Sequence, residues 1–290
     1  MKYLVRIDMT KKLACLFAAV VGLAPTVFGA AESTKAGSAA VTESRVGTWL
    51  ERQFGQASLR MTNNFLGNGA VLASPSKTSP DYYYHWTRDS ALTMDTVARL
   101  YDLSRSPADK ERFAEAMRSY AAFLHRLSDR ATLSGPVDAT FSNLGEPKYY
   151  VDGTPFDQPW GRPQTDGPAL SALTLLRFLE LQDDKSQSLG LTEDELRSIK
   201  ETLSQSLEYT AHHWQTHGFD LWEEVKGLHF YNALAQRRAL LKGATWIQKQ
   251  GHAARAAHYR AQAQALSTKI AQFWNEKQDT SLRPTNAVAD

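Results

Sequence analysis

The chain has 290 residues, of which 42% are hydrophobic and 10% aromatic, so it is long and apolar enough to bury a substantial core. Its formal charge of +2 rests on residues 1–30, where four basic residues and one acidic residue contribute +3. The remaining residues carry a net charge of −1, so charge gives no argument for nucleic acid or an anionic membrane surface as a partner.

Residues 1–30 have the pattern of an export signal. Two lysines at 11–12 precede a mostly apolar run over 13–27, and small residues at 29–31 offer a cleavage site. The apolar run is shorter than the roughly 20 residues that span a bilayer, although a membrane anchor or a buried N-terminal helix stays open as an alternative. The only cysteine, Cys15, lies in this segment. We therefore expect a secreted or periplasmic protein, without a membrane segment after signal removal, whose mature fold depends on its core rather than on disulfides.

Residues 31–44 are small and polar and predict a flexible lead-in, so the folded domain is expected over residues 45–290. Three amphipathic helices are predicted from helical spacing and start signals. They run from the N-cap Ser106, with Pro107 first, to about Ser128; from Thr192, with Glu195 as capping-box partner, to Trp214; and from about Ala253 to Trp274.

Between these helices lie three segments that are apolar more nearly all round: 92–103, 169–181 and 230–247. A helix without a wet face must be covered on all sides. Amphipathic and nearly fully buried helices thus alternate along the chain, and no convincing pair of period-two strands is found. The sequence predicts an all-α fold of a single domain.

The segment 220–224, Asp-Leu-Trp-Glu-Glu, packs three carboxylates around a tryptophan. Like charges in a partly apolar setting raise one another's pKa, so one acid of such a cluster is able to stay protonated near neutral pH, as a general acid requires. The alternative is a solvated pair of glutamates at the start of a helix, where the helix dipole favours negative charge.

Two other segments, 82–89 and 160–168, combine aromatic, arginine and carboxylate side chains. Aromatic faces stack on pyranose rings, while arginine and aspartate bind hydroxyl groups directionally. The three segments each precede a predicted buried helix, at Arg88, Asp166 and Glu223. In stacked helix pairs this brings them to one end of the molecule, so we expect a single sugar site.

Together these segments resemble the glucoamylases of the inverting glycoside hydrolases, family 15, whose catalytic domain is an (α/α)6 barrel. The resemblance extends from about residue 66 to residue 241. It rests on five motifs in the family's order, at residues 72–76, 80–90, 145–148, 160–168 and 220–225. It implies exo-acting hydrolysis of terminal α-1,4-glucosidic bonds of starch, glycogen or maltodextrins, with release of β-D-glucose. It also implies a monomer that needs no cofactor and no metal.

By this resemblance the general acid is Glu223. The substrate-binding residues are Tyr82, Trp86, Arg88, Asp89, Trp160, Asp220, Trp222 and Glu224. Within this set, Arg88 and Asp89 are expected to hold the terminal glucose, Trp86 to form part of its aromatic wall, and Trp160 to pack over the acid.

An inverting mechanism also needs a second carboxylate about 6.5–9.5 Å from the acid, and Glu224 is too near. The family's base lies beyond residue 290, so the resemblance implies a truncated catalytic domain with an incomplete barrel. Two functions stay open: the exo-hydrolase, and a maltodextrin-binding fragment that lacks the base. A third reading, another α-barrel glycosidase such as a trehalase, agrees less well with the sequences around the acid and around Arg88.

Overall fold

The structure, a computed structural model, describes residues 36–184, 188–275 and 280–281. The predicted export signal lies outside the described residues. The chain divides into two compact units, Met1–Gln56 and Ala57–Asp290. Helix α2 (Ala36–Thr62) begins in the first unit and ends in the second. It begins inside the expected lead-in, because residues 36–44 include three alanines, the strongest helix formers.

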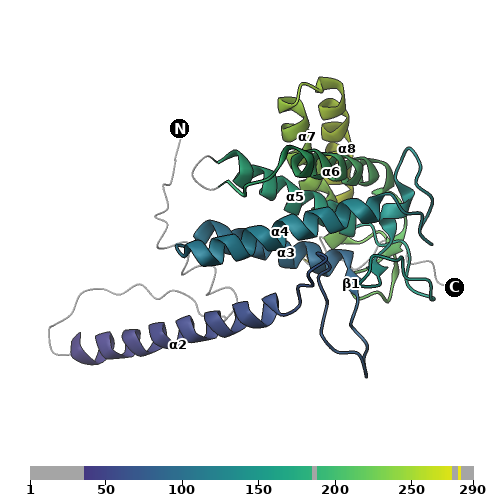
Figure 1. The fold of residues 1–290 in the computed structure, drawn as a ribbon. Helices are drawn as coiled ribbons and strands as arrows, with labels where there is room; N and C mark the ends of the chain where they lie inside the picture. Colours follow the sequence, from purple (N-terminus) through teal and green to yellow (C-terminus); the bar gives the residue numbers. More distant parts are fainter. Residues whose placement is uncertain (1–35, 185–187, 276–279, 282–290) are drawn as a thin grey trace. The chain divides into compact units, whose positions relative to one another are not determined.

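Six helices of the second unit alternate between two layers (Figure 1). They are α3 (Thr87–Leu103), α4 (Pro107–Ser128), α5 (Gly167–Asp183), α6 (Glu193–His213), α7 (Phe230–Lys249) and α8 (Ala253–Ala271). In the first layer α5 packs between α3 and α7, and we call these three helices the α3–α5–α7 layer. In the second layer α4 packs on α6, while α8 packs mainly on α7. The described chain is therefore all-α, as predicted.

The predicted helix starts are confirmed where capping determines them. The Ser106 hydroxyl accepts a hydrogen bond from the Asp109 backbone N–H, and Thr192 and Glu195 form the complete capping box. Helix α3 begins five residues before its predicted start. Arg88 therefore lies in the first turn of α3 rather than in a loop before it.

The core lies between the two layers. Its largest fully buried side chains include Met94, Met117, Tyr120, Phe123, Leu175, Phe178, Leu203 and Leu207. The prediction that the α3–α5–α7 layer is covered on all sides is wrong in part. Leu92, Leu234 and Leu241 are 45%, 42% and 40% exposed, because no described element covers that side of α3 and α7.

Three antiparallel pairs of two-residue strands connect the helices. β1 (His85–Trp86) pairs with β2 (Lys148–Tyr149), β3 (Gly218–Phe219) with β4 (Lys226–Gly227), and β5 (Trp274–Asn275) with β6 (Thr280–Ser281). Strands this short carry no period-two signal, which is why the sequence did not predict them. β1 leads directly into α3, and the β3–β4 hairpin precedes α7.

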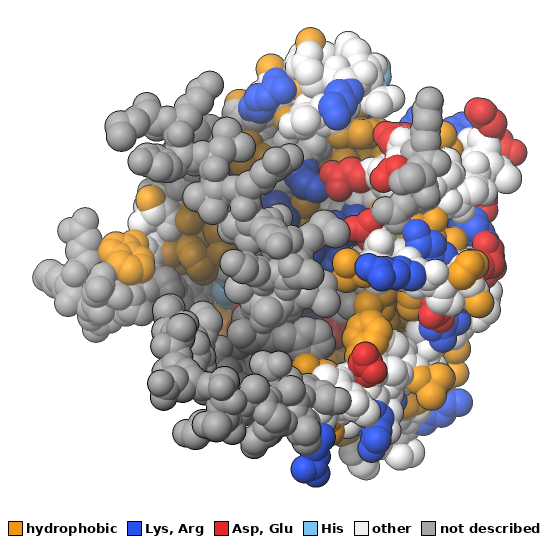
Figure 2. Space-filling view, turned by 90° about the vertical axis from the view of Figure 1, so that its left-hand side faces the viewer, with side chains coloured by type: hydrophobic (Ala, Val, Ile, Leu, Met, Phe, Trp, Pro, Cys, Tyr) orange, Lys and Arg blue, Asp and Glu red, His pale blue; other side chains and the backbone are white. Residues whose placement is uncertain are grey.

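The surface of the described residues is mixed in character. On the face drawn in Figure 2, basic, acidic and hydrophobic side chains are interspersed. None of the described helices combines the length and the hydrophobicity that a membrane crossing requires.

Candidate active site

Arg88 connects the starts of two helices. Its NH1 donates to Oδ2 of Asp166 at 2.8 Å, and its NH2 donates to Oε1 of Gln164 at 2.7 Å. Asp166 is fully buried immediately before α5, and Arg88 is 8% exposed at the start of α3. A buried carboxylate needs a charged partner, so this pair fixes where the guanidinium lies.

Gln164 connects Arg88 to the predicted acid. A guanidinium group only donates hydrogen bonds, so the amide oxygen of Gln164 must face Arg88 and its amide nitrogen must face Glu223. That nitrogen donates to Oε1 of Glu223 at 2.8 Å, and Nε1 of Trp86 donates to the same oxygen at 2.9 Å. NH2 of Arg88 lies 3.5 Å from Oε1 as well. The structure thus brings together three predicted site residues that are up to 137 residues apart.

Glu223 occupies the tip of the β3–β4 hairpin, with a positive φ of 62°. Left-handed backbone is uncommon for a residue other than glycine and is found where surrounding bonds enforce it. Here Oδ1 of Asp220 accepts the backbone N–H groups of Glu224 at 2.9 Å and Val225 at 3.1 Å, while the Glu223 N–H donates to the Asp220 carbonyl at 3.0 Å. Asp220 therefore shapes the turn. The expectation that Glu223 stands at a helix start is wrong, because the hairpin separates it from α7.

Aromatic rings flank the acid on one side. Tyr82 and Trp160 each pack edge to face on Trp86, with ring centres 5.9 Å apart. Tyr82 is 45% and Trp160 38% exposed, whereas Trp86 is buried, so the wall is open to solvent. Trp86, rather than Trp160, donates the hydrogen bond to Glu223. Trp222 is 68% exposed and makes no ring contact with the described residues.

Asp89 adds a carboxylate beside Arg88. Desolvation raises the pKa of Asp89, Arg88 lowers it, and the negative charges of Glu223 and Asp166 raise it further. Asp89 is partly desolvated by its neighbours and yet remains exposed to solvent, so it is accessible to a ligand. Three carboxylates and an amide thus surround one guanidinium, an arrangement that suits directional binding of hydroxyl groups.

Comparison with known proteins identifies the family of this chain. Residues 57–285 match the family described as "Glycosyl hydrolases family 15". The chain belongs to this family. It is 34% identical over 242 residues to the "Probable glucoamylase" of Schizosaccharomyces pombe, with 80% of this chain and 51% of the relative covered. It is 32% identical over 235 residues to "Glucoamylase 1" of Rhizopus oryzae, with 80% and 37% covered.

A solved structure, the glucoamylase from Saccharomycopsis fibuligera at atomic resolution, superposes with a TM-score of 0.76 at 31% identity. The match covers 82% of this chain and 52% of that one. The likeness confirms the predicted fold class, an (α/α)6 barrel of which this chain holds an incomplete set of helices. The chain spans about half, or less, of the length of the relatives it matches.

Gln164 and Lys148 were not predicted as members of this cluster, and Asp166 was predicted only to lie near Arg88 and Glu223, without a role of its own. All three lie inside the motifs that carried the resemblance, but most of their partners come from other segments of the chain. A neighbouring residue behaves in the same way: Arg162 bonds to Glu146 at 2.8 Å rather than to Asp166, the carboxylate of its own motif. The hydrogen-bond partners of these residues therefore could not be predicted from the residues next to them in the sequence.

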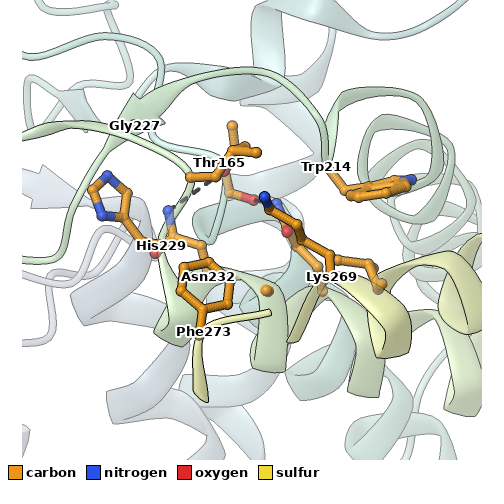
Figure 3. Close-up of a pocket in the computed structure, with 11 residues that line it drawn as sticks. Thr165, Trp214, Gly227, His229, Asn232, Lys269 and Phe273 are labelled. Atoms are coloured by element: carbon orange, nitrogen blue, oxygen red, sulfur yellow. Dashed lines mark hydrogen bonds between the residues drawn. The ribbon is translucent and has the colours of Figure 1, made fainter. Parts of the chain in front are cut away.

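One cavity beside β4 is separate from the cluster around Glu223. It lies between β4, α7 and α8, is lined by Thr165, His229, Asn232 and Lys269 among others, and has a volume of about 10 Å³ (Figure 3). A space of this size holds about one water molecule. Oδ1 of the buried Asn232 has no hydrogen-bond partner among the described residues, which suits a bound water there. Within the described residues no three metal-ligating side chains gather to hold an ion.

Proposed function

We propose that this chain carries the acid side of an exo-acting glucan hydrolase. The reaction would release β-D-glucose, with inversion, from non-reducing ends of starch, glycogen or maltodextrins. One observation carries the proposal: Oε1 of Glu223 meets Trp86, Gln164 and Arg88 in a single hydrogen-bonded cluster. The names of the relatives, which are glucoamylases, support the choice of substrate.

Arg88 and Asp89 would bind the terminal glucose. Arg88 already uses one N–H of each terminal nitrogen on Asp166 and Gln164, and Nη2 also lies 3.5 Å from Glu223, so only the N–H groups that face none of these residues would be left for sugar hydroxyls. Asp89 is exposed and would accept hydrogen bonds from the same glucose unit. The exposed rings of Tyr82 and Trp160 would stack on the apolar faces of the sugar.

The hydrogen bonds of Glu223 indicate which of its oxygens would give up a proton. Oε1 accepts from two N–H donors, so a proton on that oxygen would face other protons. In the protonated acid the hydrogen therefore belongs on Oε2. Positioned this way, Glu223 would protonate the leaving glycosidic oxygen as a general acid.

Inverting hydrolysis also requires a base about 6.5–9.5 Å from the acid, and Glu224 adjoins the acid in sequence. Because the chain spans only part of its relatives, binding of maltodextrin without hydrolysis is the second candidate function. We further propose export directed by residues 1–30, a folded domain up to residue 290, and a monomeric state.

The test measures glucose release from maltotriose by this chain, with the anomer identified by polarimetry. A Glu223→Gln variant keeps the volume and removes the proton donor, so it should abolish hydrolysis while calorimetry still detects maltose binding. Undiminished turnover by this variant would refute the acid assignment. Binding without turnover by the wild type would favour the second function, and release of glucose from trehalose would favour a different glycosidase.

A further inference from the structure

Four aromatic side chains beside the acid form a closed ring, which we call the aromatic box. The ring centres of Tyr84 and Trp86 are 5.7 Å apart, and those of Trp86 and Trp160 are 5.9 Å apart. The ring centres of Trp160 and Phe156 are 5.9 Å apart, and those of Phe156 and Tyr84 are 5.4 Å apart. The neighbouring rings meet edge to face, a favourable arrangement for aromatic pairs.

Lys148 places its ammonium group inside the aromatic box. Nζ lies 3.9 Å from the ring centre of Tyr84, 4.4 Å from that of Trp86, and 4.0 Å from those of Phe156 and Trp160. The nitrogen is nearly equidistant from all four ring centres, so it lies near the middle of the box. Aromatic faces attract a cation at such distances.

The ammonium group depends on these rings. Lys148 is 3% exposed, and among the described residues its Nζ makes no hydrogen bond and no ion pair. Glu223 and Asp81 attract it only at longer range. Buried charges are normally paired with an opposite charge, because desolvation is costly. The four rings therefore supply the attraction that a carboxylate supplies at other sites.

The backbone around the aromatic box is fixed by a buried ion pair. Trp86 and Lys148 are paired residues of β1 and β2. Glu146, two residues before Lys148, has a fully buried side chain and accepts from Arg162 at 2.8 Å. Arg162 in turn donates to the Phe156 carbonyl at 2.6 Å. The strand that carries the cation and the loop that carries two of the rings are thus held together.

We propose that Lys148 is a positioning residue for sugar binding, whose charge holds the aromatic box in the shape that presents Trp160 to a glucose unit and the buried Trp86 to Glu223. The inference rests on the proposed function, because the box contributes the wall of the sugar site. Trp86 belongs both to the box and to the hydrogen bonds of Glu223, so a change in the box also displaces a donor to the acid.

The charge of Lys148 sets a pH limit on this role. Desolvation lowers the pKa of Lys148 to about 8; Glu223 and Asp81 oppose that shift, and Arg162 adds to it. Tyr84 also faces the ammonium and donates to Asp81 at 3.0 Å; desolvation and this bond raise the pKa of Tyr84. Above about pH 8 the ammonium loses its charge, the attraction to the rings is lost, and sugar affinity should fall.

The experiment measures maltotriose binding to the full chain by calorimetry between pH 6 and pH 9.5. Lys148→Met keeps the chain length and removes the charge, while Lys148→Arg keeps a charge. We expect Lys148→Met to weaken binding by about 5- to 30-fold at pH 7 and to abolish the fall above pH 8. Lys148→Arg should stay within about threefold of the wild type.

A cation supplied from solution gives an independent readout. Lys148→Ala empties the aromatic box, so added ethylammonium should bind there and restore both maltotriose affinity and the near-ultraviolet circular dichroism of the tryptophans. Ethanol, a neutral molecule of similar size, should restore neither. A role confined to stability would not respond to the charge of the added molecule.

The outcomes separate the two proposals. If the wild type and Lys148→Met bind maltotriose equally at pH 7, the role of Lys148 is overturned and the proposed function stands. If the wild type does not bind maltotriose, the proposed function fails and this role fails with it. If Lys148→Met does not fold, the experiment with Lys148→Ala and ethylammonium is the test. Recovery of maltotriose binding supports the proposal, and no recovery overturns it.

Discussion

The α3–α5–α7 layer carries ion pairs at two levels, and the two levels differ in burial. Near the helix starts, Arg88 and Asp166 have side chains 9% and 0% exposed. Further along the same helices, the Arg177 and Asp95 side chains are 24% and 25% exposed. The Lys242 and Glu180 side chains are 36% and 56% exposed. The same three helices therefore hold charge in dry and in wet surroundings.

The two levels contribute differently to the fold. Burial of two charges costs several kcal/mol per ion, which their attraction offsets only with good geometry and further hydrogen bonds. Arg88 meets these conditions, because it bonds to Asp166 and Gln164, but Oδ1 of the buried Asp166 has no hydrogen-bond partner among the described residues. A buried pair of this kind contributes position more than stability. The pairs further along the helices remain hydrated, so they contribute little to the positions of side chains and little to stability.

The largest expected effect is at the buried level. Asp166→Ala leaves the guanidinium of Arg88 buried without its carboxylate, so we expect the free energy of unfolding to fall by about 3–5 kcal/mol. Urea denaturation monitored by circular dichroism measures this loss. Arg88 would also lose its fixed orientation, so maltose affinity should fall in the fraction that stays folded.

Glu180→Ala is the matched control, since it removes a carboxylate from the same helix at the hydrated level. A loss of less than about 1 kcal/mol for Asp166→Ala, similar to the control, would contradict the view that burial distinguishes the two levels.

An intermediate effect is expected at Asp95, which pairs with Arg177 on α5 and accepts from Arg99 at 2.9 Å. Burial raises the pKa of Asp95, but the hydrogen bonds from Arg177 and Arg99 lower it more, so the pKa lies below its ordinary value. A depressed folded-state pKa contributes stability that is present above the unfolded pKa, about 3.9, and is lost as pH falls through the folded value.

Asp95→Asn should therefore cost about 1 kcal/mol near pH 7, and the difference from the wild type should shrink as the pH falls below about 4. Urea denaturation at pH 7 and pH 3 measures both values. A difference that grows toward pH 3 would show that the sign of the pKa shift is wrong.

The predictable part of the molecule is the part that local chemistry determines. Ser106 and the Thr192–Glu195 capping box start their helices because capping bonds span three residues, which a sequence displays directly. The meeting of Arg88 and Asp166 was also predictable, because both lie at helix starts in a regular alternation of layers, whereas Glu223 reaches them from a hairpin that was not predicted. The roles assigned to the site residues stay predictions.

The rest depends on contacts between distant segments. Asp166 and Gln164, the partners of Arg88, lie 78 and 76 residues away from it in the sequence, too far for helical or strand periodicity to predict the contact. The hairpin that carries Glu223 is held by two-residue strands and by hydrogen bonds to Asp220. From the sequence alone, Asp220 was only a third carboxylate near Glu223. Lys148 gave no signal because its partners are rings from two other motifs and from residue 156, which lies outside the motifs.

The smallest effect is expected at the wettest pair. In Glu180→Gln, an amide oxygen replaces a carboxylate that accepts from Lys242 Nζ at 2.8 Å, and both side chains are already well hydrated. The free energy of unfolding should change by no more than about 0.5 kcal/mol, and raising the salt concentration to 0.5 M should remove most of that difference, because exposed charges are screened. Paired urea denaturations at low and high salt measure it. A loss above about 2 kcal/mol that resists salt would mean that the hydrated level positions the helices as strongly as Arg88 and Asp166 do, and the comparison between the two levels would no longer hold.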